Sequence, residues 1–349
     1  MIPEGKEVPS LFVDKQTTIQ QLVASESHAS HRSRLEQFIY ATICAWPHLT
    51  ILQAAQAAVQ LARPMRIFEL QGFEGISHSL NHIDLRSVLE WQILGFQPRD
   101  NAAAILLSNP GPLPAEEPTP PLAFYMGTQV VDVENSGAAI PTLSSHINRW
   151  KKRRGRFHEP ATYAGFHRAF TEDTARMLGN IAKIGALATW EDTKQEAASW
   201  AELPHPPAII GDTPPQHLTT ENAWYHFRIG KHLGRDAFAE IALCLGNVFC
   251  HHLPQVWTDY SLNSANDDPR GVLLESEAAG SIAIARIGGP ARRGGSFFKD
   301  ALFDANQPLP ENFDLCTVLA AATEIQELLQ GDSLPVVGAN WYADDPYYP

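Results

Sequence analysis

Apolar side chains recur every three or four residues near the middle of the chain, between Pro160 and Leu203. The members of this stripe are Phe166, Phe170, Thr174, Met177, Ile181, Ile184 and Ala188. Their spacing is that of one face of an α-helix. The segment is longer than the usual globular helix of about 10–14 residues. We therefore predict a long central helix, or a tight helix pair, against which the rest of the chain packs.

Shorter periodic patterns predict helices on both sides of this stripe. They cover His31–Trp46, a helix that ends before Pro64, Ser79–Leu94, Glu221–Leu233, Arg235–His251 and a last helix from Asp314 to Gly331. Thr50 and Gln53 have the spacing of a capping box at the start of the second helix. Asp314 is a candidate N-cap, and Gly95 follows its helix where a left-handed cap is favoured.

Strand patterns are fewer. Ala102–Leu107 reads as a short strand, and Ala123–Val133 is rich in β-branched and aromatic residues, which favours a second strand. Gly271–Ile287 could form a β-hairpin around Ala278–Ser281. Helix outweighs strand, so the predicted fold class is mainly α with minor β. In this prediction the helical core forms around the long central helix, with proline-rich connectors and extended terminal arms.

Proline marks the predicted organisation of the chain. Ser108–Pro121 holds six prolines, and Pro204–Pro215 is a second proline-rich stretch. Proline fixes φ and removes a backbone donor, which favours extended connectors. We predict an N-terminal arm over 1–30, a single helix-rich body over 31–335, and a C-terminal aromatic arm over 336–349. The body could subdivide near 108–121 and 204–219.

Composition narrows the function. The net charge of −13 disfavours a general binder of nucleic acid or anionic membrane, because such proteins are usually basic. No apolar run is long enough for a membrane helix, and the first residues do not form a signal peptide. The four cysteines form no CxxC motif, which predicts reduced thiols in a cytoplasmic protein. Only 19% of residues are charged, which suits a protein that buries surface against partners.

The sharpest local charge feature is the sequence RWKKRRGR. It supplies Arg149, Trp150, Lys151, Lys152, Arg153, Arg154 and Arg156, with six of the 26 basic residues of the chain. Such a run could contact RNA phosphates while the tryptophan stacks on a base. The alternative is a solvated loop that pairs with acidic neighbours.

A second candidate is the glycine-rich loop Ile287–Phe298, which contains Arg292 and Arg293. Its backbone N–H groups could form an anion-binding nest, and the arginines could add a bidentate grip. The loop lacks the GxxxxGK[ST] pattern of a phosphate-binding P-loop. The alternative is a flexible connection between subdomains.

No other residues combine into a recognised chemistry. The histidine pairs His78 and His82, His226 and His232, and His251 and His252 lack an HExxH motif or an acidic partner at ligand spacing, so we predict no metal and no cofactor. Glu275 and Glu277 would share one face of a strand, as in the ExE pair of ADP-ribosyl-transferring enzymes. An ordinary acidic pair is the alternative, and we nominate no catalytic residue.

The C-terminal arm carries Trp341, Tyr342, Tyr347 and Tyr348 within its last nine residues. Exposed aromatic side chains are costly unless they dock, which makes this arm a candidate subunit interface. The arm could dock on its own subunit or on another.

In length, helix-rich character and the absence of a strongly basic arm, this layout resembles the coat proteins of partitivirus-like (cryptic) double-stranded-RNA viruses. The resemblance covers the general plan of the chain. It implies a self-assembling capsid subunit that encloses RNA in a virion, with copies of itself as partners, weak RNA contact and no membrane. The alternatives are an enzyme or effector that binds a phosphate-bearing ligand through the loop 287–298, and a soluble partner-binding protein.

Overall fold

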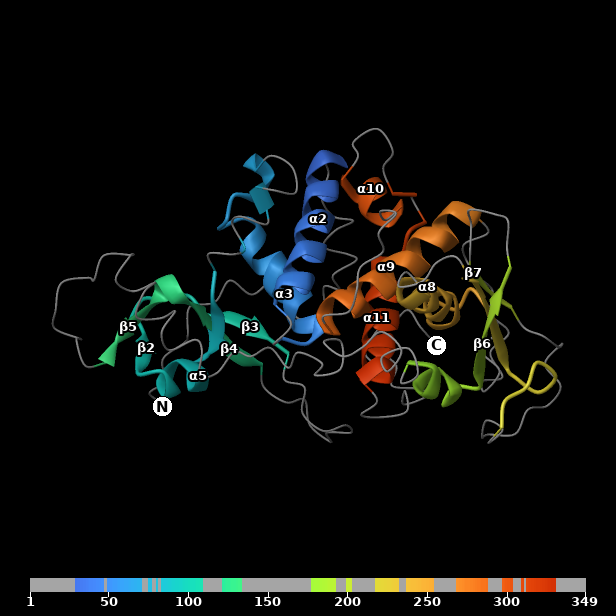
Figure 1. Cartoon of the computed structure of the whole chain (residues 1–349). Coiled ribbons are helices and arrows are strands. Elements are labelled where there is room, and N and C mark those ends of the chain that lie inside the picture. The colour runs from blue at the N-terminus through green and yellow to red at the C-terminus, as the bar shows by residue number, and fades with distance from the viewer. Residues whose placement is uncertain are drawn as a thin grey trace, which may run out of the picture. The chain divides into compact units, whose positions relative to one another are not determined.

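The computed structural model describes residues 29–46, 49–70, 75–76, 80, 83–108, 121–133, 177–192, 199–202, 217–231, 237–253, 268–287, 297–303, 309–310 and 312–330. The chain divides into two compact units, Met1–Ala161 and Thr162–Pro349. Figure 1 labels their elements. Helix outweighs strand among the described residues, which confirms the mainly-α class with minor β.

In the part of the first unit that the structure describes, the first two elements are the helices α2 (Ala29–Ala45) and α3 (Ile51–Ala62). The capping box at the start of α3 is confirmed. Thr50 Oγ1 accepts the Gln53 N–H at 3.1 Å, and Gln53 Oε1 accepts the Thr50 N–H at 3.0 Å. These two bonds satisfy backbone donors that an α-helix otherwise leaves unpaired at its start.

Glutamine side chains of α3 bind the edge of a small sheet. The sheet has the order β1-β4-β3, from Leu85–Ser87, Leu122–Met126 and Ile105–Leu107. Gln60 exchanges two hydrogen bonds with the Leu106 backbone, at 2.9 and 3.2 Å. Gln53 and Gln56 bind the carbonyl and N–H of Ser108 at 2.8 and 2.9 Å. The helix thus covers the edge of β3 as a further strand would.

The prediction of one helix over Ser79–Leu94 is wrong in its middle. Leu85–Ser87 forms strand β1, which pairs antiparallel with β4, and α5 begins only at Val88 and ends at Ile93. Ser87 and Glu90 form a second capping box, whose bonds fix the start of α5. Gly95 follows the helix with φ 81°, which confirms the predicted left-handed cap.

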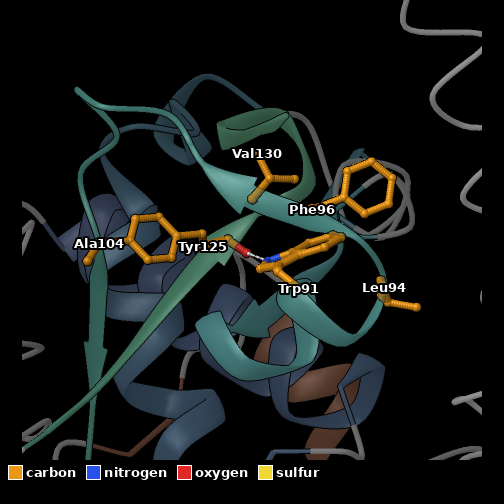
Figure 2. Packing of buried hydrophobic residues seen from close by; sticks show 6 residues of the cluster. All are labelled: Trp91, Leu94, Phe96, Ala104, Tyr125 and Val130. Atoms are coloured by element: carbon orange, nitrogen blue, oxygen red, sulfur yellow. Dashed lines mark hydrogen bonds between the residues drawn. The ribbon is translucent and has the colours of Figure 1, made fainter. Parts of the chain in front are cut away.

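Around α5 lies a compact apolar cluster, shown in Figure 2. Its buried members are Trp91, Leu94, Phe96, Ala104, Tyr125 and Val130. The Trp91 indole donates to the Tyr125 carbonyl at 2.8 Å and meets the Phe96 ring edge-on, with centroids 5.8 Å apart. The cluster joins α5 to β2 (Phe96–Pro98), to β5 (Val130–Asp132) and to β4.

Both predicted strand regions of this unit contain strands. Ala102–Leu107 contains β3, while Ala123–Val133 is divided between β4 and β5 by a 3₁₀ turn at Gly127–Gln129. The division follows from the hydrogen bonds of Gln129. Its side chain accepts the Met126 N–H at 2.8 Å and donates to the Ala103 carbonyl at 2.7 Å.

The helices of the second unit include α8 (Ala237–Phe249), α9 (Pro269–Ile287), α10 (Phe297–Phe303) and α11 (Leu315–Gln330). The predicted Asp314 cap is confirmed, because Asp314 Oδ1 accepts the Cys316 N–H at 2.8 Å. Helices α8 and α11 both lie in ranges where the sequence predicted them, and their buried residues include Ile241, Leu245, Val318 and Ile325. Glycines at Gly246 and Gly280 allow α8 and α9 to meet backbone to backbone.

The predicted β-hairpin over Gly271–Ile287 is wrong, because this segment lies within helix α9. Pro269 stands at the first helical position, where its fixed φ fits, and Asp268 Oδ1 accepts the Arg270 N–H at 3.0 Å. Leu274, Ala278 and Ile282 recur every four residues and are buried. That period is typical of a helix, although Gly280–Ser281 has the form of a hairpin turn dipeptide.

The central stripe is confirmed in part. Met177, Ile181 and Ile184 are buried, and residues 177–182 are helical. The helix does not continue, because Gly185 adopts φ 71° and Ala186–Glu191 forms strand β6. The stripe residues Phe166, Phe170 and Thr174 lie outside the described residues, as do the predicted C-terminal arm and residues 1–28 of the predicted N-terminal arm. Ala29 and Ser30, which the prediction placed in that arm, already belong to α2.

The helix predicted over Glu221–Leu233 is also wrong. Tyr225–Gly230 forms strand β8, which pairs parallel with β6 and antiparallel with β7 (Ser199–Glu202). Tyr225, Phe227 and Ile229 are fully buried, with more polar residues between them. This alternation has the period of a half-buried strand. The apolar side of the sheet packs against α8.

A buried acid on α11 gives the second unit a pH dependence. Burial, with a smaller effect of Glu327, raises the pKa of Glu324 from 4.5 to about 7. The folded state therefore binds the Glu324 proton more tightly than the unfolded state does. This difference stabilises the folded protein fully below pH 4.5, and the stabilisation is lost as the pH rises through 7. We expect Glu324→Gln to raise the free energy of unfolding at pH 8 by about 1–3 kcal/mol.

The same variant should change little at pH 4, where Glu324 is protonated in both states. Urea denaturation of the two proteins at several pH values measures this difference. An equal gain at all pH values would show that the titration of Glu324 is not its cause.

Candidate functional sites

The residues that the sequence predicted to bind RNA, an anion or another subunit lie outside the described part of the chain. This holds for the basic run Arg149–Arg156, for Arg292 and Arg293, and for the aromatic residues of the C-terminal arm. Their roles stay predictions. His78, His82 and His232 also lie outside it, whereas His226, His251, His252, Glu275 and Glu277 are described.

A row of polar side chains crosses the sheet of the second unit. The register pairs Thr189 with Arg228 and Glu202 with His226, which places these four side chains on the same side of the sheet. Thr189 Oγ1 lies 2.8 Å from His226 Nε2, and Glu202 Oε1 lies 3.5 Å from His226 Nδ1. Arg228 donates to Glu202 at 2.6 Å and to Glu191 at 3.1 Å.

A hydroxyl, an imidazole and a carboxylate in this order are also the parts of a nucleophilic site. Catalysis further requires that a substrate reach the imidazole and the hydroxyl. His226 is only 6% exposed, and Arg228 already holds the Glu202 carboxylate. The arrangement therefore suits a hydrogen-bond network that joins three strands better than it suits a nucleophilic site.

The two glutamates of the ExE candidate lie on helix α9, and both are buried. Because residues two apart on a helix point about 200° apart, the pair cannot present two carboxylates to one substrate. Glu277 Oε2 accepts the Phe298 N–H at 3.1 Å, at the start of α10. The prediction that Glu275 and Glu277 share one face of a strand is wrong.

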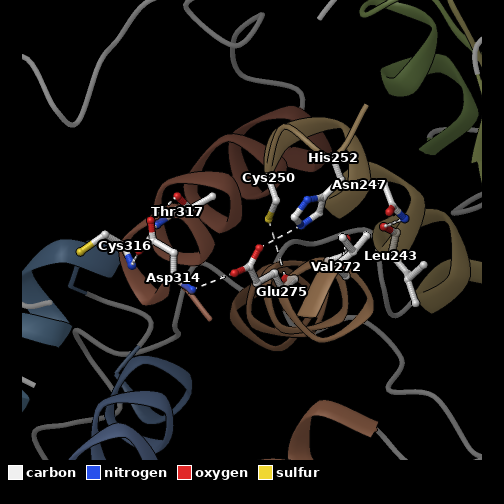
Figure 3. A network of polar contacts seen from close by, with 10 residues as sticks. Leu243, Asn247, Cys250, His252, Val272, Glu275, Asp314, Cys316 and Thr317 are labelled. Carbon is white, nitrogen blue, oxygen red and sulfur yellow. Dashed lines mark hydrogen bonds and ion pairs between the residues drawn. The ribbon is translucent and has the colours of Figure 1, made fainter. Parts of the chain in front are cut away.

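Glu275 is the centre of a polar cluster among α8, α9 and α11, shown in Figure 3. One carboxylate oxygen accepts the Asp314 N–H at 2.7 Å, and the other lies 3.0 Å from His252 Nε2. His251 ends α8 in a left-handed conformation with φ 62°. Burial raises the pKa of the Cys250 thiol, and the nearby Glu275 adds to this effect.

This cluster holds helices together. Cys250 stays a thiol, and a thiol is a poor nucleophile and a poor metal ligand. All four cysteines are described, and none is in a disulfide. Within the described ranges, no group of three or more His, Cys, Asp or Glu side chains is arranged to hold a metal ion.

A different kind of site lies on the first unit. We call it the α5 face and define it by Leu89, Ile93 and Val133, whose side chains are 66%, 57% and 48% exposed. Leu89 and Ile93 are four apart and share one side of α5. Val133 donates its N–H to the carbonyl of Gly95, two residues beyond Ile93, at 3.0 Å. Leu89 is the most exposed large hydrophobic side chain in the described part of the chain.

The sequence analysis missed this face, although a signal exists. The helix sequence VLEWQI has apolar residues on opposite sides, because Trp91 is buried while Leu89 and Ile93 are not. A short helix with apolar residues on opposite sides needs cover on both of them. Gln92, also exposed, adds no charge to the face.

No protein-family model matches the sequence, and no curated protein or solved structure matches it significantly. Among the helices of the described residues, none is long and apolar enough to cross a membrane.

Proposed function

We propose that the chain is a self-assembling structural protein, a coat subunit that packs with copies of itself into a closed shell around RNA. The observation that carries the proposal is the α5 face. Exposed apolar side chains gathered on one surface are typical of protein–protein contacts. Heterologous contacts between identical subunits generate closed assemblies when their geometry closes.

The chemistry of the described polar residues also supports a structural role. Glu275, Glu277 and the side chains around His226 are engaged in contacts that join helices or strands of the fold. The net charge of −13 suits a container whose RNA must stay mobile, because strong neutralisation of phosphates would immobilise it. The basic run Arg149–Arg156 then supplies a weak, local RNA contact.

The experiment that tests self-assembly is a size measurement on the full chain by light scattering and electron microscopy. We expect large particles of many copies at physiological salt. Leu89→Lys combined with Ile93→Lys should convert them to small species, because a charge at the centre of an apolar contact must be desolvated. Both residues are exposed, so the variant should melt near the temperature of the wild type.

A matched control is Gln97→Lys combined with Asn101→Lys, which adds the same charge at two exposed positions of the first unit outside α5. If the apolar contact drives assembly and net charge does not, this control should assemble as the wild type does. A full chain that stays a monomer or dimer under all conditions would overturn the proposal. The alternative of a phosphate-binding enzyme rests on the loop 287–298, of which residues 288–296, including Arg292 and Arg293, lie outside the described residues.

A further inference from the structure

The α5 face adjoins a sheet edge. Val133 directly follows β5, which pairs antiparallel with β2 in a sheet of two strands. Among the strands that the structure describes, β5 has a neighbour on one side only. An apolar surface beside a strand with one neighbour is the type of site that extended peptide segments occupy, because backbone and side chains can both contribute.

The size of the face indicates what kind of partner fits it. A stable contact between two folded surfaces buries about 800 Å² on each partner. Three partly exposed side chains provide far less, so two α5 faces packed against each other would form a weak pair. One aromatic side chain buries about 150–250 Å², so one or two aromatic anchors from an extended segment match the face.

The chain itself contains such a segment. Beyond α11, which ends at Gln330, the C-terminal arm carries two pairs of adjacent aromatic residues, Trp341 with Tyr342 and Tyr347 with Tyr348. Pro346 restricts the free arm, which lowers the entropy lost on docking. Asp344 and Asp345 between the pairs can stay in water at the rim of an uncharged face.

We propose that the α5 face of one copy binds the aromatic C-terminal arm, Trp341–Tyr348, of a neighbouring copy. The inference rests on the proposed self-assembly and names the contact that produces it. Each copy then gives one arm and receives one, which is a heterologous contact that extends from copy to copy. Ten residues separate Gln330 from Trp341, and extended chain spans at most about 33–36 Å over that length, which bounds the distance from α11 to the face that the arm can occupy.

Complementation between two defective variants tests this contact. The first variant lacks residues 341–349 and keeps the α5 face. The second carries Leu89→Lys with Ile93→Lys and keeps the arm. Each alone should give small species, because each lacks one half of every contact. Mixed together, they should form a one-to-one complex, since the arm of the second can dock on the face of the first but cannot propagate.

A labelled peptide of residues 336–349 supplies a second measurement that does not depend on assembly. Fluorescence anisotropy should show binding to the variant that lacks 341–349. Binding to a chain that also carries Leu89→Lys and Ile93→Lys should be more than about tenfold weaker, and binding to the Gln97→Lys, Asn101→Lys control should be unchanged. Circular dichroism confirms that all these chains are folded.

The outcomes separate this inference from the proposed function. If the full chain forms particles and the chain without 341–349 forms them equally well, the arm contact is wrong while self-assembly stands. If the full chain forms no particles, self-assembly is wrong, and peptide binding then decides whether the arm docks on its own subunit. Peptide affinity that is indifferent to Leu89 and Ile93 overturns the inference in every case.

Discussion

Replacing Gly246 by alanine is expected to lower the free energy of unfolding of the second unit by about 3 kcal/mol. A Cβ at this position of α8 would overlap the backbone carbonyl of Ser276 on α9. Backbone atoms cannot rotate away as a flexible side chain can, so the two helices would have to separate. Overpacking of this kind typically costs about 1–3 kcal/mol and occasionally more. Urea denaturation followed by circular dichroism measures the loss.

The reciprocal position gives the same expectation, because a Cβ at Gly280 would lie 2.7 Å from the Ala242 backbone. Gly179 offers a matched control. It is exposed in the helical residues 177–182, and a Cβ there would meet no atom within 4 Å. Gly179→Ala should therefore stabilise the protein by about 0.4–1 kcal/mol. Similar effects at Gly246 and Gly179 would show that α8 and α9 do not meet this closely.

Helix ends were the most predictable feature of this fold, because capping is local chemistry. The Thr50–Gln53 box and the Asp314 cap each involve side chains within three residues of the helix start, and both appear as the sequence indicates. Gly95 is similar, since the need for a left-handed conformation is local. The buried stripes of α8 and α11 follow from the 3.6-residue period alone.

The errors arise where distant pairing decides the structure. Leu85–Ser87 and Tyr225–Gly230 lie in segments that also read as helices, and each becomes a strand because a partner strand is available. Strand preference depends strongly on such context. For Gly271–Ile287 the predicted hairpin is wrong because apolar residues recur every four positions, which is a spacing typical of a helix.

The candidate sites likewise depend on contacts between residues that are distant in the sequence. The polar row of Thr189, Glu202 and His226 comes from three strands, and its members are brought together by register rather than by sequence spacing. The α5 face depends on which side of a six-residue helix the body covers. Sequence spacing places Leu89 and Ile93 on one side of that helix, but their exposure is a property of the folded unit.

Ile181→Asp is expected to destabilise the second unit by about 4 kcal/mol or more. Ile181 is 1% exposed and lies in the helical residues 177–182, beside the buried Met177 and Ile184. The change removes a buried apolar side chain and introduces a carboxylate that must either stay charged without a partner or take up a proton. Effects above about 4 kcal/mol are exceptional, and an unpaired buried charge is one of their few causes.

The expected result in practice is a protein that is poorly soluble or melts far below the wild type. Lys183→Asp is the control, because it places the same carboxylate on an exposed position two residues away. It should change the stability by less than about 1 kcal/mol. The helix is also tied to the end of α11 by the Asn180 side chain, which donates to the Leu329 carbonyl at 3.1 Å. Loss of packing at Ile181 should therefore loosen α11, whereas near-normal melting of Ile181→Asp would contradict the buried stripe.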